Sequence, residues 1–203
     1  SNTILIFTSD NGPWNDKSAT YLRGKKFSNF EGGQRVPTIV WWPGKIGAGK
    51  VSDRLGSTID ILPTLASISG IKYKSRDGSA LDGVDLSAHW LGRSDETPRK
   101  DFYYYGHTCT PKPQGVQDGR WKLLVQTRKP KGKTPNKQSD PLPWLFDLKS
   151  DERETTNVAK DNPEVVKRLT AKINAFEKQV IATKREPWRE KEPGWRISSS
   201  PWE

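Results

Sequence analysis

Residues 3–46 read TILIFTSDNGPWNDKSATYLRGKKFSNFEGGQRVPTIVWWPGKI, and this stretch decides the fold of the chain. Its opening run, Thr3 to Thr8, is apolar and rich in branched residues, which predicts a strand buried on both faces. The run Val36 to Trp42 predicts a second strand, closed by the turn at Pro43-Gly44. We therefore expect both strands to belong to a parallel or mixed sheet with helices on its faces.

The first predicted strand ends at Asp10-Asn11-Gly12. Ligands of open α/β sheets gather at the carboxyl ends of strands, so this position is a candidate binding site. A carboxylate beside an amide carbonyl offers oxygen ligands, which suit Ca²⁺ or Mg²⁺ better than zinc. Alone, the tripeptide is more simply explained as a turn, because these three residue types are common in turns.

Composition narrows the class of protein. The 203 residues are 32% hydrophobic and include 17 glycines and 15 prolines, which predicts many turns and loops. No apolar run approaches the roughly 18 residues of a membrane span. Cys109 is the single cysteine, which excludes an internal disulfide framework and a Cys-cluster zinc site. The net charge of +10 favours anionic partners such as nucleic acid, a membrane surface or a sulfated or phosphorylated substrate, although a solvated basic surface explains it equally.

Two helices are predicted beyond the opening stretch. The first covers Ser57 to Ser69, where Ser57 and Asp60 have capping-box spacing, and Pro63 suggests that its regular part begins later than the cap. The second runs from Pro163 to about Ile181. Its apolar positions repeat at intervals of three and four residues and form one stripe: Val166, Leu169, Ile173, Phe176 and Val180.

The chain changes character after a turn-rich connector, Arg76 to Gly92. A small antiparallel sheet is then predicted from strands at Phe102–Tyr105 and Trp144–Leu148 and a hairpin at Gly115–Val125, with a basic loop at Thr127–Ser139. The predicted fold class is α/β (α+β overall): the end of an α/β sheet layer, then a small antiparallel sheet with a long C-terminal helix. We predict boundaries at 1–95, 96–182 and 183–203, the last part being an extended Trp/Pro-rich tail.

The segments FTSDNG and LRGKKFSNFEGGQRVPTIVWWPG resemble the second signature region of the sulfatase family, within the alkaline-phosphatase-like superfamily. The resemblance continues in order through TIDILPTLASISGI, LDGVDLSAHWLG, GVQDGRWKLL and LFDLKSDERETTNVAKDNPEVVKRL, from Thr3 to about Lys178. It implies the C-terminal portion of a formylglycine-dependent sulfatase acting on a sulfated small molecule or sulfated glycan. It also implies a periplasmic, secreted or lysosomal-type compartment.

The resemblance assigns roles residue by residue. Asp10 and Asn11 match the metal-binding pair, which implies Ca²⁺, and Lys26 matches the sulfate-contacting lysine, whereas Lys25 is out of register. A cation and an ammonium group on the sulfate oxygens would stabilise charge that develops in the transition state. Glu31-Gly32-Gly33 is expected to be structural: the glycines permit a close approach of backbones, and Glu31 is expected to pair with Arg35.

Other parts of the family pattern are missing from the sequence. The Cys/Ser-x-Pro/Ala-x-Arg motif that yields formylglycine is absent, as is the Asp-Asp metal motif, and CTPKP at Cys109 departs from the pattern. His107 is a candidate for lining the pocket, while His89 is expected to be a packing or surface residue. We therefore expect the isolated chain to be inactive without an N-terminal half, to lack enough ligands for Ca²⁺, and to expose apolar surface on its first strand.

Two alternatives remain at this point. A phosphodiesterase or phosphonate hydrolase of the same superfamily would share the sheet and metal ligands but have another nucleophile. A basic polyanion-binding module would draw support from nine tryptophans beside many Lys and Arg residues, since aromatic rings can stack on bases. The tryptophans are scattered along the chain, however, so we do not expect nucleic acid to be a partner.

Overall fold

The structure is a computed structural model that describes residues 2–15, 21–73, 81–106, 112–126 and 141–183. His107, Cys109, the predicted basic loop at Thr127–Ser139 and nearly all of the predicted tail lie outside the described residues. The predicted boundaries at 1–95, 96–182 and 183–203 stay a prediction. None of the helices in the described ranges has the length and apolar character to cross a membrane.

The opening stretch forms a two-stranded antiparallel sheet. Strand β1 (Leu5–Thr8) pairs with β2 (Thr38–Trp41), with Leu5 opposite Trp41 and Thr8 opposite Thr38. The expectation that these strands join a parallel or mixed sheet is wrong for the described residues, because the intervening chain folds back and returns β2 alongside β1. A backbone hydrogen bond from Gly12 N–H to the Gly33 carbonyl, 3.1 Å long, holds this reversal beyond the strand ends.

One face of this pair is apolar and exposed. Because side chains alternate along a strand, the register places four large apolar residues on the same face: Leu5, Phe7, Ile39 and Trp41. Between 54% and 61% of each of these residues is accessible to solvent, so the prediction of a strand buried on both faces is also wrong. The expected exposure of apolar surface on the first strand is confirmed. We call these four residues the apolar β1–β2 face.

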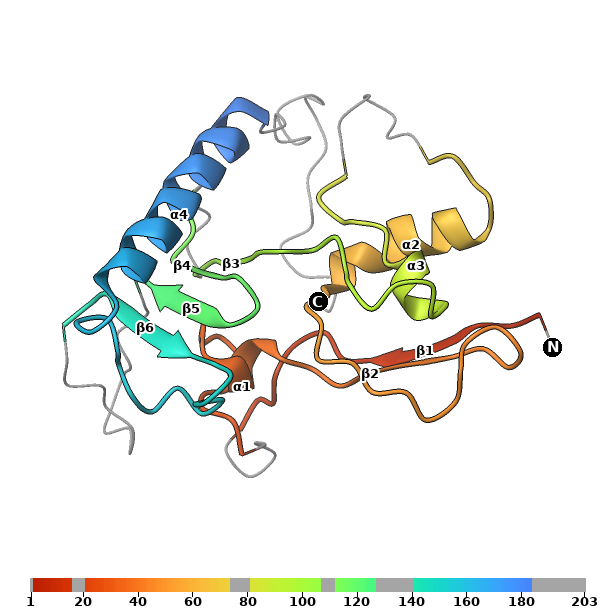
Figure 1. The fold of residues 1–203 in the computed structure, drawn as a ribbon, viewed down its shortest axis with the longest axis horizontal. Coiled ribbons are helices and arrows are strands. Elements are labelled where there is room, and N and C mark those ends of the chain that lie inside the picture. Colours follow the sequence, from red (N-terminus) through yellow and green to blue (C-terminus); the bar gives the residue numbers. More distant parts are fainter. Residues whose placement is uncertain (1, 16–20, 74–80, 107–111, 127–140, 184–203) are drawn as a thin grey trace, which may run out of the picture.

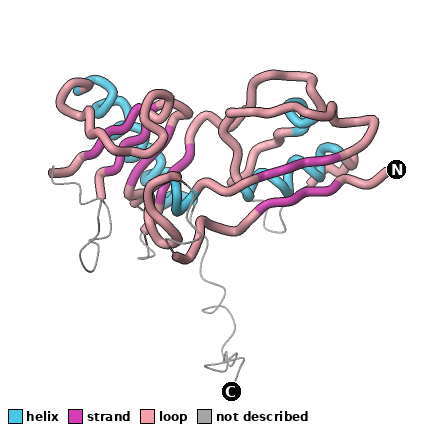
Figure 2. The backbone as a smooth tube through the Cα atoms, turned by 90° about the horizontal axis from the view of Figure 1, so that it is seen from below, coloured by secondary structure: helices cyan, strands magenta, loops and turns pink. Residues whose placement is uncertain are grey.

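A helical segment lies at the same end of the molecule as β1 and β2 (Figures 1 and 2). A 3₁₀ turn, η2 (Thr58–Asp60), leads into α2 (Ile61–Ile68), so the regular helix does begin after the capping residue. Pro63 falls in the first turn of α2, where no N–H is needed for an intrahelical bond. The connector contains a further single-turn helix, α3 (Ser87–Trp90).

Buried Asp60 fixes this segment. Its carboxylate accepts backbone hydrogen bonds from Ser57 and Val84, each 2.8 Å long, so the predicted contact between Ser57 and Asp60 is present. The guanidinium of Arg99 donates to both carboxylate oxygens. The bidentate pair compensates the burial of the charge and ties α2 to the chain that enters the second sheet.

The second sheet has four antiparallel strands in the order β3-β4-β5-β6. Their bounds are β3 (Phe102–Tyr104), β4 (Gly115–Gln117), β5 (Trp121–Leu124) and β6 (Trp144–Asp147). The predicted hairpin is confirmed: β4 and β5 turn at Asp118-Gly119, where Gly119 has a φ of +90°. Such a left-handed conformation is readily available to glycine.

Helix α4 (Pro163–Thr183) packs on this sheet (Figure 1). The stripe predicted from the sequence supplies its contact surface: Leu169 and Ile173 are buried against Val116, Leu123 and Leu145 of the sheet. Full burial of each such side chain stabilises the fold by about 1.5–3 kcal/mol. One hydrophobic cluster of the described chain therefore lies between α4 and the second sheet, and a second one, Leu124, Trp144 and Phe146, packs against Phe30 and Leu148.

Candidate functional site

The loop between β1 and β2 begins with the predicted metal-binding pair. Asn11 Nδ2 donates to Asp10 Oδ1 at 2.8 Å, and Ser9 Oγ donates to the backbone carbonyl of Asn11 at 3.2 Å. Asp10 is exposed and Asn11 is half-buried. This bond uses the amide nitrogen of Asn11 and one carboxylate oxygen of Asp10, so it does not involve the amide oxygen of Asn11 or the second carboxylate oxygen of Asp10.

Three glycines bring the two ends of this loop together. Gly12 bonds to Gly33 through the backbone, and Gly32 N–H donates to the Arg23 carbonyl at 2.7 Å. A Cβ atom on Gly12 would collide with the carbonyl of Gly32, and one on Gly32 or Gly33 would meet carbonyl oxygens of residues 23–28. The predicted close approach of backbones is confirmed. We call Gly12, Gly32 and Gly33 the glycine crossing.

Lys26 lies on the same loop as the metal-binding pair. Its backbone N–H donates to the Pro13 carbonyl at 2.9 Å, which places Lys26 beside the segment that follows Asn11. Its ammonium nitrogen is 5.7 Å from the ring centroid of Trp14 and 5.5 Å from that of Phe27. Asp10, Asn11 and Lys26 thus lie in the same loop between β1 and β2, and two aromatic rings lie beside the Lys26 ammonium group.

The described residues contain no cluster of three or more His, Cys, Asp or Glu side chains that could hold a metal ion. The candidate ligands from this chain remain the carboxylate of Asp10 and the amide oxygen of Asn11. Both are hard oxygen donors of the kind that calcium prefers. The chemistry of this donor pair is compatible with a calcium ion, and two side chains are fewer than the six to eight oxygen ligands that calcium takes.

A buried cluster of charged residues anchors the loop between β1 and β2 to the second sheet. Lys122 Nζ lies 2.8 Å from Glu31 Oε1 and 2.8 Å from Glu154 Oε1, and Glu154 Oε2 accepts the Glu31 N–H at 2.6 Å. Tyr104 Oη donates to Glu31 Oε1 at 3.1 Å. At most 6% of any of these four residues is exposed. The cluster joins α1 (Glu31–Gln34), on the site loop, to strands β3 and β5 and to the chain after β6.

The predicted pairing of Glu31 with Arg35 is wrong. Arg35 follows the end of α1 on the exposed side of the loop, and its Nη1 atom lies 3.8 Å from Glu152 Oε1. Glu31 points into the interior, where Lys122 is the cation that satisfies it. A lysine within the apolar run of β5 is the sequence signal that indicates this buried charge.

Burial and charge shape the ionisation of the cluster. Burial opposes ionisation of Glu31, but the charge and hydrogen bond of Lys122 and the Tyr104 hydroxyl outweigh it and lower the pKa of Glu31. Burial dominates at Glu154 and raises its pKa despite Lys122. Burial and the two neighbouring carboxyl groups hold the pKa of Tyr104 well above its ordinary value. The two carboxyl groups beside Lys122 therefore have pKa values shifted in opposite directions, Glu31 downward and Glu154 upward.

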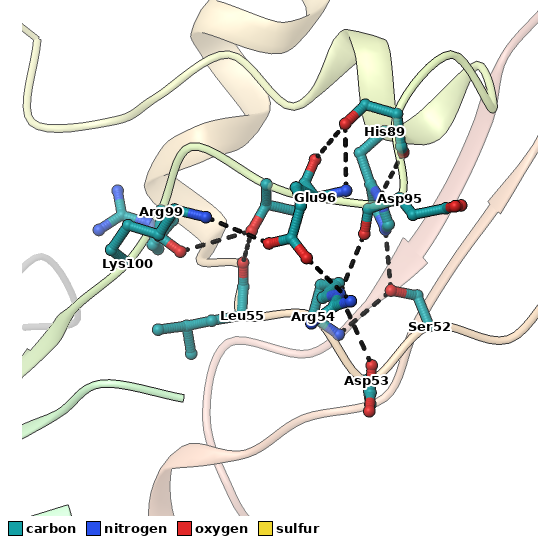
Figure 3. A network of polar contacts seen from close by, with 11 residues as sticks. Ser52, Asp53, Arg54, Leu55, His89, Asp95, Glu96, Arg99 and Lys100 are labelled. Atoms are coloured by element: carbon teal, nitrogen blue, oxygen red, sulfur yellow. Dashed lines mark hydrogen bonds and ion pairs between the residues drawn. The ribbon is translucent and has the colours of Figure 1, made fainter. Parts of the chain in front are cut away.

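His89 lies in a separate polar network on α3 (Figure 3). Its Nε2 atom is 2.8 Å from Ser52 Oγ and its Nδ1 atom is 3.1 Å from the Ser94 carbonyl. Nearby, Arg54 and Glu96 form an ion pair of 3.0 Å. The half-buried histidine thus ties the segment after β2 to the segment after α3, as expected of a packing or surface residue.

Comparisons with known proteins agree with the fold and the loop. The sulfatase family model matches residues 1–71. The chain is 42% identical over 114 residues to N-acetylgalactosamine-6-sulfatase of Canis lupus familiaris. This match covers 53% of this chain and 21% of that protein. It is 35% identical over 186 residues to N-acetylgalactosamine-6-O-sulfatase of Bacteroides thetaiotaomicron. This match covers 83% of this chain and 35% of that protein. The chain is 33% identical over 195 residues to human arylsulfatase A, and this match covers 82% of this chain and 36% of arylsulfatase A.

Solved structures give the same result. A sulfatase of Bacteroides thetaiotaomicron involved in glycosaminoglycan metabolism superposes with a TM-score of 0.68 at 29% identity, covering 87% of this chain and 39% of that one. The PsFucS1 sulfatase of Pseudoalteromonas sp. reaches 0.75 at 23% identity, covering 91% and 38%, which supports the fold. The chain spans between about a fifth and two fifths of the lengths of these proteins. These matches support the assignment of this chain to the C-terminal part of a sulfatase.

Proposed function

We propose that the protein to which this chain belongs hydrolyses sulfate esters, and that the loop between β1 and β2 forms one wall of its active site. The observation that carries the proposal is the arrangement of this loop. Backbone hydrogen bonds from Gly12 to Gly33 and from Lys26 to Pro13 fold back the loop that carries Asp10, Asn11 and Lys26, and this loop lies inside the segment that matches the sulfatase family model.

In this proposal Asp10 and Asn11 hold Ca²⁺ through oxygen atoms, and Lys26 binds a sulfate oxygen. Bound calcium would supply a Lewis acid that polarises the sulfate. The Lys26 ammonium orients the sulfate and stabilises negative charge that grows on it in the transition state. Calcium takes six to eight oxygen ligands, so the remaining ligands are assigned to an N-terminal half of the same protein. The formylglycine nucleophile is assigned to that half as well.

Sulfated glycans or smaller sulfated sugars are the proposed substrates. Relatives are named for sulfated N-acetylgalactosamine, and one solved relative contains D-glucosamine-2-N,6-O-disulfate as its substrate. The net charge of +10 favours such anionic molecules. We propose a periplasmic, secreted or lysosomal-type compartment, which the resemblance to the family implies.

The test uses the complete product of the reading frame that encodes these residues. We expect it to release sulfate from N-acetylgalactosamine 6-sulfate, and we expect Lys26→Ala to lower kcat/KM by about 100-fold, because a group that stabilises transition-state charge is lost. Lys25→Ala is the matched control and should retain activity within about twofold, because surface substitutions away from a site have small effects. Chelation should abolish turnover and added Ca²⁺ should restore it.

Other outcomes would reject the proposal. Equal losses for Lys25→Ala and Lys26→Ala would show a general effect of charge rather than a sulfate-binding lysine. Hydrolysis of phosphodiesters without hydrolysis of any sulfate ester would show that the protein is a phosphodiesterase rather than a sulfatase. Full activity of Lys26→Ala would remove that residue from the site.

A further inference from the structure

Two exposed aromatic side chains flank the candidate sulfate-binding lysine. Trp14 is 67% exposed and Phe27 is 47% exposed. Their rings meet edge to face, with 5.5 Å between centroids and an interplanar angle of 75°. Large apolar side chains gathered at the surface beside a charged group are typical of a ligand-binding surface rather than of a solvated loop.

The backbone holds both rings next to Lys26. Trp14 directly follows Pro13, whose carbonyl accepts the Lys26 N–H, and Phe27 directly follows Lys26. Phe27 has a φ of +75°, a left-handed conformation that is unfavourable for a bulky residue. Strain of this kind persists where the surrounding structure imposes it, and it clusters at binding sites. The loop therefore positions the Phe27 ring despite the local cost.

Resting on the proposed function, we infer that Trp14 and Phe27 form a platform for the pyranose ring of a sulfated sugar. A sulfate bound to the Lys26 ammonium would lie on the same surface as both rings, because the ammonium is 5.7 Å and 5.5 Å from their centroids. The sugar ring attached to that sulfate meets the aromatic rings. A pyranose presents C–H groups on its faces, and these pack on aromatic rings while the hydroxyl groups stay solvated.

The platform and the lysine divide recognition between them. The ammonium of Lys26 recognises the anion, whichever molecule carries it, whereas Trp14 and Phe27 recognise the ring attached to it. Trp14 is thus a specificity-determining residue, and its removal should affect sugar sulfates without affecting inorganic sulfate.

The experiment compares Trp14→Ala and Trp14→Phe in the complete product of the reading frame. The readouts are KM and kcat for a panel of sulfated N-acetylgalactosamine, glucosamine and galactose, and the inhibition constant of inorganic sulfate. For Trp14→Ala we expect KM for the preferred sugar to rise about fivefold, in line with the value of one aromatic contact, with kcat and sulfate inhibition unchanged. Trp14→Phe should recover most of the loss. Tyr73→Ala, another exposed aromatic residue, beyond α2, is the control and should match wild type.

Failures of the inference and of the proposed function are distinguishable. If wild type hydrolyses sulfated sugars but Trp14→Ala keeps its KM, the platform is rejected and the function stands. The platform is likewise rejected if Trp14→Ala weakens sugar and inorganic sulfate equally, or if wild type hydrolyses only sulfate esters that lack a sugar. If wild type neither hydrolyses any sulfate ester nor binds sulfate, both the proposed function and the proposed sugar platform are rejected. Thermal unfolding of each variant confirms that the loop is folded.

Discussion

Lys122 shows how single residues support the site from outside it. Its ammonium has no exposed surface and lies between the carboxylates of Glu31 and Glu154. Glu31 begins α1, which contains two of the three residues of the glycine crossing. The position of the site loop therefore depends on a cation 91 residues away in the sequence.

Replacement of Lys122 tests this dependence. We expect Lys122→Met to lower the free energy of unfolding by about 3–5 kcal/mol, because it leaves buried carboxyl groups without their cation. Lys149→Met, at an exposed lysine, is the matched control and should change stability by less than about 0.5 kcal/mol. Urea unfolding at neutral pH measures both. Equal stability of the two variants would show that the cluster contributes little.

At this scale the sequence predicted some residues and missed others. Asp10, Asn11 and Lys26 were singled out because their motif is local in the sequence, and their assigned roles stay a prediction. The partner of Glu31 was predicted wrongly because the nearest arginine in the sequence lies on the other side of α1. The pairing with Lys122 depends on how α1 meets β5, and a short-range pattern does not encode that contact.

Among the elements, α4 and the second sheet follow most directly from sequence patterns. The apolar stripe of α4, the Asp118-Gly119 turn and the strand compositions all indicate the same arrangement. The ring of Phe176 on α4 stacks on Tyr103 of β3, with 3.8 Å between centroids. The direction of the β1–β2 pairing could not be predicted in this way, because strand composition does not show how the intervening loop folds back.

The residues in contact between α4 and β3 include Tyr103, whose ionisation should lower the stability of the fold at alkaline pH. Burial, followed by nearby Asp101 and Tyr105, raises the pKa of Tyr103 to about 12 from an ordinary value of 10.0. The unfolded chain releases this proton near the ordinary value, whereas the folded chain keeps it until about 12. The stability linked to this proton is therefore complete below pH 10.0 and is lost as the pH rises toward about 12.

Tyr103→Phe should reduce this loss because it removes the titrating phenol and keeps the ring stacked on Phe176. The measurement is urea unfolding in steps between pH 10.0 and about 12, where wild type should lose more free energy of unfolding than the variant. Tyr73→Phe controls for removal of a phenol elsewhere. An identical pH profile for wild type and Tyr103→Phe would contradict the assignment.

At the scale of the whole molecule, the apolar β1–β2 face departs from the ordinary surface of a folded protein. Register alone places its four residues together, and their apolar character is plain in the sequence. Exposed patches of this kind promote association in water. The match to human arylsulfatase A covers 36% of that protein. In a protein of that length, segments outside the matched part are available to cover such an apolar face.

We expect the 203-residue chain on its own to bind a hydrophobic dye and to self-associate. Phe7→Lys with Ile39→Glu should suppress both, because these positions face each other across the strands and would pair as opposite charges. Ile71→Lys with Val51→Glu, at exposed apolar residues outside this face, is the matched control. Dye fluorescence and size-exclusion chromatography report the result. A monomeric wild-type chain without dye binding would contradict the expectation.

The glycine crossing has a consequence for genetic variation. Every other amino acid carries a Cβ atom, so each missense change at Gly12, Gly32 or Gly33 introduces an atom where a neighbouring backbone already lies. The chemistry of the new side chain is secondary, and alanine is already too large. Surveys of tolerated variants should therefore contain almost no substitutions at these three codons, and inherited changes at them should reduce the amount of folded protein rather than alter its specificity.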